Sequence, residues 1–197
     1  MEELQQLQDQ TRERVIFLQG FLKRPLQVGS IVPSSRFLER RIVELAEVKS
    51  ARTVVELGAG VGGTARAILD AIPETTKFLS IEINPAFCAL VERIQDPRLI
   101  VHCGPAEELR ATISHYGLPA PDVVVSGIPF STMSRTTGSR ILETISTVLA
   151  PGGRFVAYQV SGQVAALARP LLGPARVEVE LRNIPPIRLY RWEKSPR

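Results

Sequence analysis

The sequence predicts an α/β fold in which a mostly parallel, seven-stranded sheet carries helices on both faces. Residues 53–57 (TVVEL) form a β-branched run that leads into four glycines within positions 58–63, and an Ala- and Ile-rich helical pattern follows directly. The same order of strand and helix repeats through 77–83 (KFLSIEI), a helix that begins at Pro85, and a third strand over 99–103. Because parallel strands need crossover connections, this alternation indicates a Rossmann-like fold.

The remaining elements follow from the same strand and helix periodicities. They are a helix over 36–48 capped by Ser34 or Ser35, strands over 122–126 and 154–160, an exposed Ser- and Thr-rich loop over 131–139 that is a candidate substrate lid, a helix over 140–149, and antiparallel strands over 175–181 and 187–192.

Length and composition fit one domain of residues 25–197 behind an amphipathic helix of residues 1–24. The chain has 197 residues, 44% of them hydrophobic and 22% charged, as is ordinary for a globular protein. The net charge of +4 favours an anionic partner such as phosphate, a lipid head group or RNA. The helix, which Pro25 ends, either lies in a lipid interface through a stripe that includes Phe21 and Leu22, or packs on the domain or on a second copy.

Cysteine and histidine indicate no metal site. Cys88 and Cys103 have no second cysteine at metal or redox spacing, so we expect two buried, reduced thiols in a reducing cytoplasm. We expect His102 within a strand and His115 at a helix end. No apolar run approaches the roughly 18 residues that span a bilayer, and no basic segment starts the chain. A protein that is neither transmembrane nor secreted by the usual signal is therefore expected.

The glycine-rich turn predicts a nucleotide-like ligand. Glycine lets backbone amides approach a ligand, and the helix that follows adds unpaired N-terminal donors. Glu82 ends the second strand at about the 20-residue spacing at which dinucleotide folds place a ribose-binding carboxylate. A nicotinamide cofactor and a plain structural turn are the alternatives. Glu56 is absent from the dinucleotide fingerprint, whereas residues 56–62 (ELGAGVG) resemble the first motif of S-adenosylmethionine-dependent methyltransferases.

Four stretches make the chain similar to bacterial phospholipid N-methyltransferases. They are 24–35 (RPLQVGSIVPSS), 56–62 (ELGAGVG), 126–130 (SGIPF) and 182–186 (RNIPP), so the resemblance covers nearly the whole chain. It implies a class I methyltransferase fold that binds S-adenosylmethionine and releases S-adenosylhomocysteine. The cofactor contacts implied are Ser30, Glu56, Gly58, Ala59, Gly60, Gly62, Glu82, Ile83, Ala106, Glu107 and Ser126. Glu107 is alternatively a first-turn acid favoured by the helix dipole.

The acceptor is expected at the loop after the fourth strand, because ligands in open α/β sheets bind beyond the carboxyl ends of the strands. The resemblance implies methylation of the amine of phosphatidylethanolamine and, if the step is repeated, formation of phosphatidylcholine. The substrate-side residues predicted are Ser126, Gly127, Ile128, Phe130, Tyr158 and Arg188. Backbone carbonyls would hold the amine, Phe130 would face its charge, and Tyr158 with Arg188 or Arg182 would bind the phosphate. Each of these four side chains is alternatively an ordinary core or surface residue.

Two other functions remain as alternatives. Ribosomal RNA adenine dimethylases carry a similar loop, Asn-Leu/Ile-Pro-Tyr/Phe, but Gly127 stands where their Asn would accept a hydrogen bond from the target amine. Nucleic acid is therefore not expected as a partner. A non-catalytic protein that binds S-adenosylmethionine is the second alternative. The preferred prediction is a cytoplasmic enzyme associated peripherally with the inner face of the membrane, in contact with phosphatidylethanolamine and anionic lipids.

Overall fold

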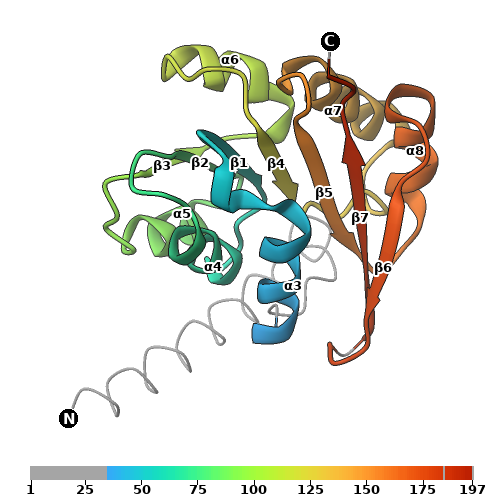
Figure 1. Cartoon of the computed structure of the whole chain (residues 1–197), viewed down its shortest axis with the longest axis horizontal. Coiled ribbons are helices and arrows are strands. Elements are labelled where there is room, and N and C mark those ends of the chain that lie inside the picture. The colour runs from blue at the N-terminus through green and yellow to red at the C-terminus, as the bar shows by residue number, and fades with distance from the viewer. Residues whose placement is uncertain (1–34, 184, 197) are drawn as a thin grey trace.

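The computed structural model describes residues 35–183 and 185–196 (Figure 1). The predicted helix over 1–24 and Ser30 lie outside the described residues. Within them the predicted α/β fold is confirmed, because seven strands form one sheet in the order β3-β2-β1-β4-β5-β7-β6. Neighbouring strands are parallel except at β7, which runs antiparallel to both β5 and β6.

Strands and helices alternate along the chain as crossover connections require. The strands are β1 (Thr53–Leu57), β2 (Lys77–Glu82), β3 (Leu99–Cys103), β4 (Val123–Ser126), β5 (Arg154–Gln159), β6 (Arg176–Glu180) and β7 (Ile187–Glu193). The helices are α3 (Arg36–Ala46), α4 (Gly63–Ala71), α5 (Pro85–Glu92), α6 (Leu109–His115), α7 (Arg135–Val148) and α8 (Gln163–Leu172), with the 3-10 turns η1 (Val48–Ser50) and η2 (Ala106–Glu108). Every strand lies within one residue of its predicted bounds.

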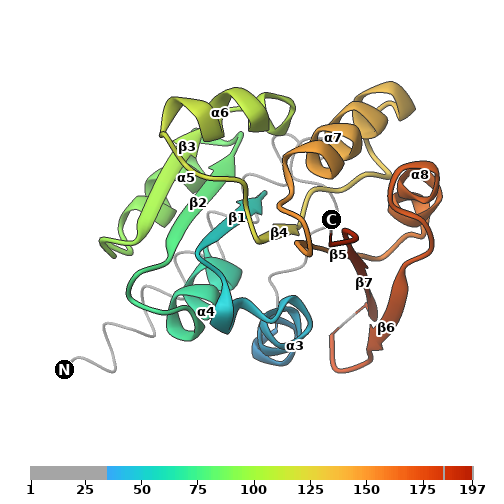
Figure 2. The same ribbon diagram turned by 45° about the horizontal axis from the view of Figure 1, so that its top comes forward.

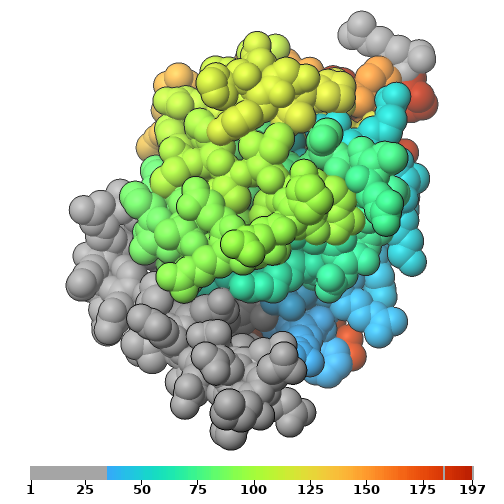
Figure 3. Space-filling model, turned by 90° about the vertical axis from the view of Figure 1, so that its left-hand side faces the viewer, coloured from blue at the N-terminus to red at the C-terminus, as the bar shows by residue number. Residues whose placement is uncertain are grey.

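Helices cover both faces of the sheet, as predicted (Figure 2). On one face α3, α4 and α5 pack on strand side chains such as Val54 and Phe78 in a single buried cluster. On the other face α6, α7 and α8 enclose a second cluster, in which the rings of Phe155 and Trp192 stack with centroids 5.0 Å apart. Toward the β3 edge, α4, α5 and α6 form one continuous surface (Figure 3). The central parallel strands are buried on both faces, which explains why their sequences are mostly apolar, with Glu56 in β1 as the charged exception.

Two helix boundaries differ from the prediction because of local capping. α3 ends at Ala46 rather than at residue 48, since Glu47 adopts a left-handed conformation (φ 50°) and its amide bonds back to the last turn. α7 begins five residues earlier than predicted, because the Ser134 hydroxyl accepts a hydrogen bond from the Thr137 amide at 3.0 Å and caps the helix. Residues 135–139 are therefore helical, and the predicted loop is confined to 131–134.

One helix and one cysteine also depart from the prediction. The sequence prediction contains no helix between β5 and β6, where α8 buries Val164, Leu167 and Ala168 at helical spacing. Cys103, which was expected to be buried, is exposed because it ends β3 at the edge of the sheet, whereas Cys88 is buried as expected. His102 in β3 and His115 at the end of α6 have the predicted positions.

Candidate active site

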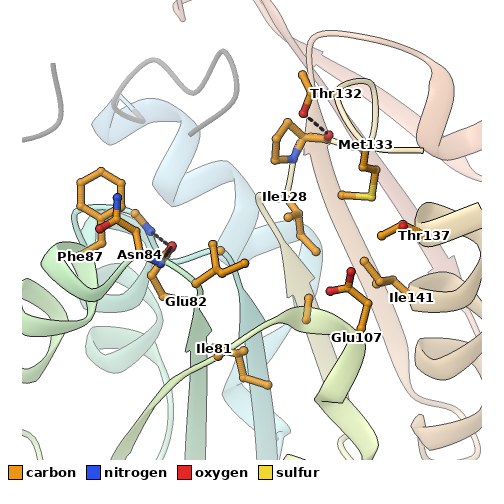
Figure 4. A pocket seen from close by; sticks show the side chains of 16 residues that line it. Ile81, Glu82, Asn84, Phe87, Glu107, Ile128, Thr132, Met133, Thr137 and Ile141 are labelled. Atoms are coloured by element: carbon orange, nitrogen blue, oxygen red, sulfur yellow. Dashed lines mark hydrogen bonds between the residues drawn. The ribbon is translucent and has the colours of Figure 1, made fainter. Parts of the chain in front are cut away.

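A cavity of about 200 Å³ opens at the carboxyl ends of the central strands, where the glycine turn and the acceptor loop were both predicted (Figure 4). Glu82 and Asn84, at the end of β2, lie on one side of it, and α7 forms part of the opposite wall. Of the predicted site residues, the cavity wall contains Gly58, Gly60, Glu82, Ile83, Ala106, Glu107 and Ile128. The two loops predicted to hold cofactor and acceptor therefore do meet at one site.

The glycine turn has the backbone geometry that its sequence predicts. Gly58, Gly60 and Gly62 have φ values of 81°, 54° and 84°, a region in which a side chain would strain the backbone. A Cβ on Gly58 would lie 3.3 Å from the Ile128 amide nitrogen, so glycine at this position lets the two loops approach. Gly62, the N-cap residue of α4, has no side chain that could cap this helix.

Glu82 is held in place by backbone donors on both of its oxygens. The Gly60 amide donates to Oε2 and the Asn84 amide donates to Oε1, each at 2.9 Å. Burial raises the pKa of this carboxyl, while these amide hydrogen bonds oppose the rise. A fixed carboxylate at a cavity wall, with lone pairs left on both oxygens, can accept hydrogen bonds from a pair of vicinal hydroxyls.

Glu56 lies inside the sheet and does not reach this cavity. Its side chain is fully buried; Oε2 accepts a hydrogen bond from the Ser80 hydroxyl at 3.0 Å, and Oε1 has no partner among the described residues. Burial raises the pKa of Glu56 to about 8, so the group is mostly protonated at neutral pH. Ala59 and Gly62, two further predicted cofactor contacts, belong to the glycine turn but are not in the cavity wall.

The acceptor loop is fixed by hydrogen bonds to its own backbone. The Ser126 hydroxyl accepts from the Ile128 amide at 3.3 Å, and the Gly127 amide donates to the Leu57 carbonyl at 2.9 Å. The Gln159 side-chain amide donates to the Ile128 carbonyl at 2.5 Å. No group in the described part of the chain donates to the Gly127 carbonyl. Of these two carbonyls, that of Gly127 is the one without a donor among the described residues, although Ser126 and Gly127 themselves are not part of the cavity wall.

Tyr158 occupies the space that a side chain on residue 127 would need. A Cβ added to Gly127 would lie 2.7 Å from Cζ of Tyr158, closer still to its hydroxyl, and 3.1 Å from the Gly58 carbonyl. The tyrosine is only 7% exposed, and its hydroxyl lies 3.5 Å from that of Thr64. Burial raises the pKa of Tyr158 well above its usual value. Tyr158 therefore supports the acceptor loop from within the core and does not line the cavity.

The other predicted substrate contacts do not line the described cavity. The Phe130 ring is fully buried between α7 and α8, so its predicted role at a substrate cation has no support in this geometry. Arg188 is exposed, and its guanidinium donates to the Val160 carbonyl at 2.6 Å. Arg182 forms an ion pair with Glu180.

Sequence reasoning missed several residues that shape the site. Gln159, which holds the Ile128 carbonyl, was read only as part of a strand. Thr137 and Ile141 line the cavity from the first half of α7, and Met133 lines it from the loop just before this helix. Recognising Ser134 as a helix cap would have placed Thr137 on the same helix as Ile141, with Met133 directly before it.

Comparisons with known proteins show what this arrangement resembles. The chain is 29% identical over 178 residues to the ornithine lipid N-methyltransferase of Singulisphaera acidiphila, covering 89% of this chain and 93% of that protein. Among solved structures it is similar to TrmN from Thermus thermophilus (TM-score 0.65, 18% identity), with 84% of this chain matching half of that one. It is also similar to the N-methyltransferase NodS from Bradyrhizobium japonicum (TM-score 0.69, 11% identity, 81% and 96% covered). An RNA methyltransferase from Salinibacter ruber, solved with S-adenosylhomocysteine, matches with a TM-score of 0.58, 19% identity and coverage of 84% and 95%. No protein-family model matches the chain.

The fold is that of class I S-adenosylmethionine-dependent methyltransferases. Together with the named relative and neighbours, it supports S-adenosylmethionine as the cofactor and methyl transfer as the reaction. Within residues 35–183 and 185–196, no helix is both long and apolar enough to cross a membrane. The same residues contain no group of three or more His, Cys, Asp or Glu side chains placed to hold a metal ion.

Proposed function

We propose that this protein transfers methyl groups from S-adenosylmethionine to the primary amine of a membrane lipid. The curated relative supports a lipid substrate, because it is named for N-methylation of a lipid and matches most of both chains. The structural observation that carries the proposal is the backbone-only acceptor position at Gly127, where Tyr158 excludes a side chain. An adenine-specific loop of the dimethylase type would need an amide side chain at this position.

The residues of the cavity suit the parts of the proposed cofactor. Both oxygens of Glu82 retain lone pairs for the ribose hydroxyls, and Ala106 and Glu107 border the place expected for adenine. The N-terminus of α4, which Gly62 leaves without a side-chain cap, favours a carboxylate. When bound, S-adenosylmethionine supplies an electrophilic methyl group.

On the acceptor side, this chain positions an amine and orients its lone pair. A lipid ammonium would have to release one proton to water before its nitrogen could attack the methyl group that S-adenosylmethionine supplies, with S-adenosylhomocysteine as the leaving product. The Gly127 carbonyl, which has no donor among the described residues, would accept a hydrogen bond from the amine, while Ser126 and Gln159 keep the loop rigid through Ile128. Correct positioning of this kind accounts for much of the rate of many enzymes.

Two lipids fit the proposal. Phosphatidylethanolamine, which the sequence resemblance implies, carries its amine near a phosphate. An ornithine lipid, which the curated relative's name favours, carries a primary amine and a carboxylate. Both present a cation and an anion a few atoms apart. We propose exposed Arg188, at the start of β7, as the contact for that anion.

Radiolabelled methyl transfer from S-adenosylmethionine tests this function directly. Purified protein is incubated with vesicles containing phosphatidylethanolamine, with vesicles containing ornithine lipid, or with RNA, and Glu82→Ala serves as the inactive control. Label in either lipid supports the proposal and identifies the substrate. Label in RNA alone, or label in no acceptor although S-adenosylhomocysteine binds, overturns it.

A further inference from the structure

β6 is the outermost strand of the sheet (Figure 1). Three apolar side chains are exposed at alternate positions along this strand and just past its end. Val177, Val179 and Leu181 are 50%, 53% and 73% exposed. Val177 pairs with Tyr190 and Val179 pairs with Arg188, and side chains of directly paired residues share one face of a sheet. We call Val177, Val179, Leu181 and Arg188 the β6 strip.

The acids of β6 lie on the face of the sheet opposite to the β6 strip. The acids of β6, Glu178 and Glu180, alternate with the strip, so they face the side of α3, where they pair with Arg41 and Arg182. Residues 144–177, which include all of α8 beside the strip, contain no Asp or Glu. Arg188 is thus the charged member of an apolar row, and its contact with the Val160 carbonyl uses one of five guanidinium donors.

The β6 strip leads to the acceptor loop through a short chain of contacts. Both β5 and β6 run antiparallel to β7, so β5 and β6 run in the same direction. The carboxyl end of β6, with Leu181 just after it, therefore lies at the same edge of the sheet as the carboxyl end of β5 and the cavity. Arg188 pairs with Gln159 across β5 and β7, and Gln159 holds the Ile128 carbonyl. A surface that binds the β6 strip therefore lies beside the place proposed for the lipid amine.

We propose that the β6 strip docks on the surface of an anionic phospholipid bilayer and thereby presents the acceptor loop to its substrate. This inference rests on the proposed lipid methyltransferase function. The apolar side chains enter the boundary between head groups and acyl chains, while Arg188 binds a lipid phosphate. Arg188 and the apolar row suit this partner, because an anionic bilayer has negatively charged head groups next to its hydrocarbon core.

Vesicle binding by the full chain tests the docking surface. The variant Val179→Thr with Leu181→Gln keeps side-chain size and charge, and threonine suits a strand. We expect at least a roughly tenfold lower partition onto phosphatidylglycerol and phosphatidylethanolamine vesicles, because two apolar contacts are lost. The matched control is Leu171→Gln, which removes a 41%-exposed apolar side chain on α8 outside the β6 strip. The control should bind vesicles like the unmodified protein.

Activity on a short-chain lipid dispersed as monomers separates docking from catalysis. The double variant should methylate this lipid at the normal rate while losing activity on vesicles. Unchanged vesicle binding, an equal loss in Leu171→Gln, or conversion of a dimer into monomers in the double variant would overturn the docking proposal. If the unmodified protein methylates no lipid, but the double variant still loses vesicle binding, the proposed function fails and the docking surface stands.

Discussion

The contact between Gly127 and Tyr158 makes a strong prediction for the variant Gly127→Ala. The added methyl group would lie 2.7 Å from Cζ of Tyr158 and 3.1 Å from the Gly58 carbonyl. Neither can retreat easily, because the tyrosine is buried and the carbonyl belongs to the backbone. Overpacking of this kind costs about 1 to 3 kcal/mol, and the rigid neighbours place the cost in the upper half of that range. The melting temperature should fall by roughly 4 to 12 °C.

Urea denaturation measures this cost, and a second substitution tests its cause. Tyr158→Leu removes the end of the ring, so Gly127→Ala should cost much less in that background, with a coupling of at least about 1 kcal/mol. Gly162→Ala is the control, because its Cβ would meet only the Tyr190 hydroxyl at 3.8 Å, an ordinary contact. Equal stability of the Gly127→Ala and Gly162→Ala variants, or additive effects of Gly127→Ala and Tyr158→Leu, would refute the steric argument.

The remaining predictions concern three buried polar side chains. Glu82→Ala should weaken binding of S-adenosylhomocysteine at least tenfold by calorimetry, since two charge-assisted hydrogen bonds worth roughly 1.5 to 3 kcal/mol each are lost. Gln159→Leu should lower kcat by one to two orders of magnitude without changing S-adenosylhomocysteine affinity, because the released Ile128 carbonyl misplaces the acceptor loop; displacements of about 1 Å cost roughly a hundredfold. Glu56 keeps its proton in the folded state up to a pKa of about 8, against an ordinary value of 4.5. The free energy of unfolding should therefore fall as pH rises between these two values, and this fall should be much smaller in Glu56→Gln.

Each of these predictions has a clear contrary outcome. Unchanged affinity in a folded Glu82→Ala protein would mean that the carboxylate does not hold the ribose. A parallel loss of cofactor affinity in Gln159→Leu would point to general destabilisation of the site and not to positioning of the acceptor. An equally steep pH dependence in Glu56→Gln would assign the titration to another group.

Local sequence patterns were sufficient to predict the strands of the sheet and, within the site, the glycine turn and Glu82. The buried strands are mostly β-branched or apolar runs, and the last two alternate apolar with charged residues, so the limits of every strand could be predicted to within one residue. The glycine turn and Glu82 were predictable for the same reason, because their geometry depends on backbone conformation and on spacing within one strand-turn-strand unit. Helix limits were less predictable, since single caps at Glu47 and Ser134 decided them.

What the sequence alone determined was which residues lie at the carboxyl edge of the sheet, and only the tertiary structure decided which of their side chains face the cavity. Phe130 and Tyr158 follow or belong to strands that end at the site, yet both turn into the core, because neighbouring helices and the glycine at residue 127 leave room for them there. Gln159 on β5 reaches the Ile128 carbonyl in the loop after the neighbouring strand β4, 31 residues away in sequence. Contacts of that kind depend on the packing of distant elements, which no periodicity within one segment encodes.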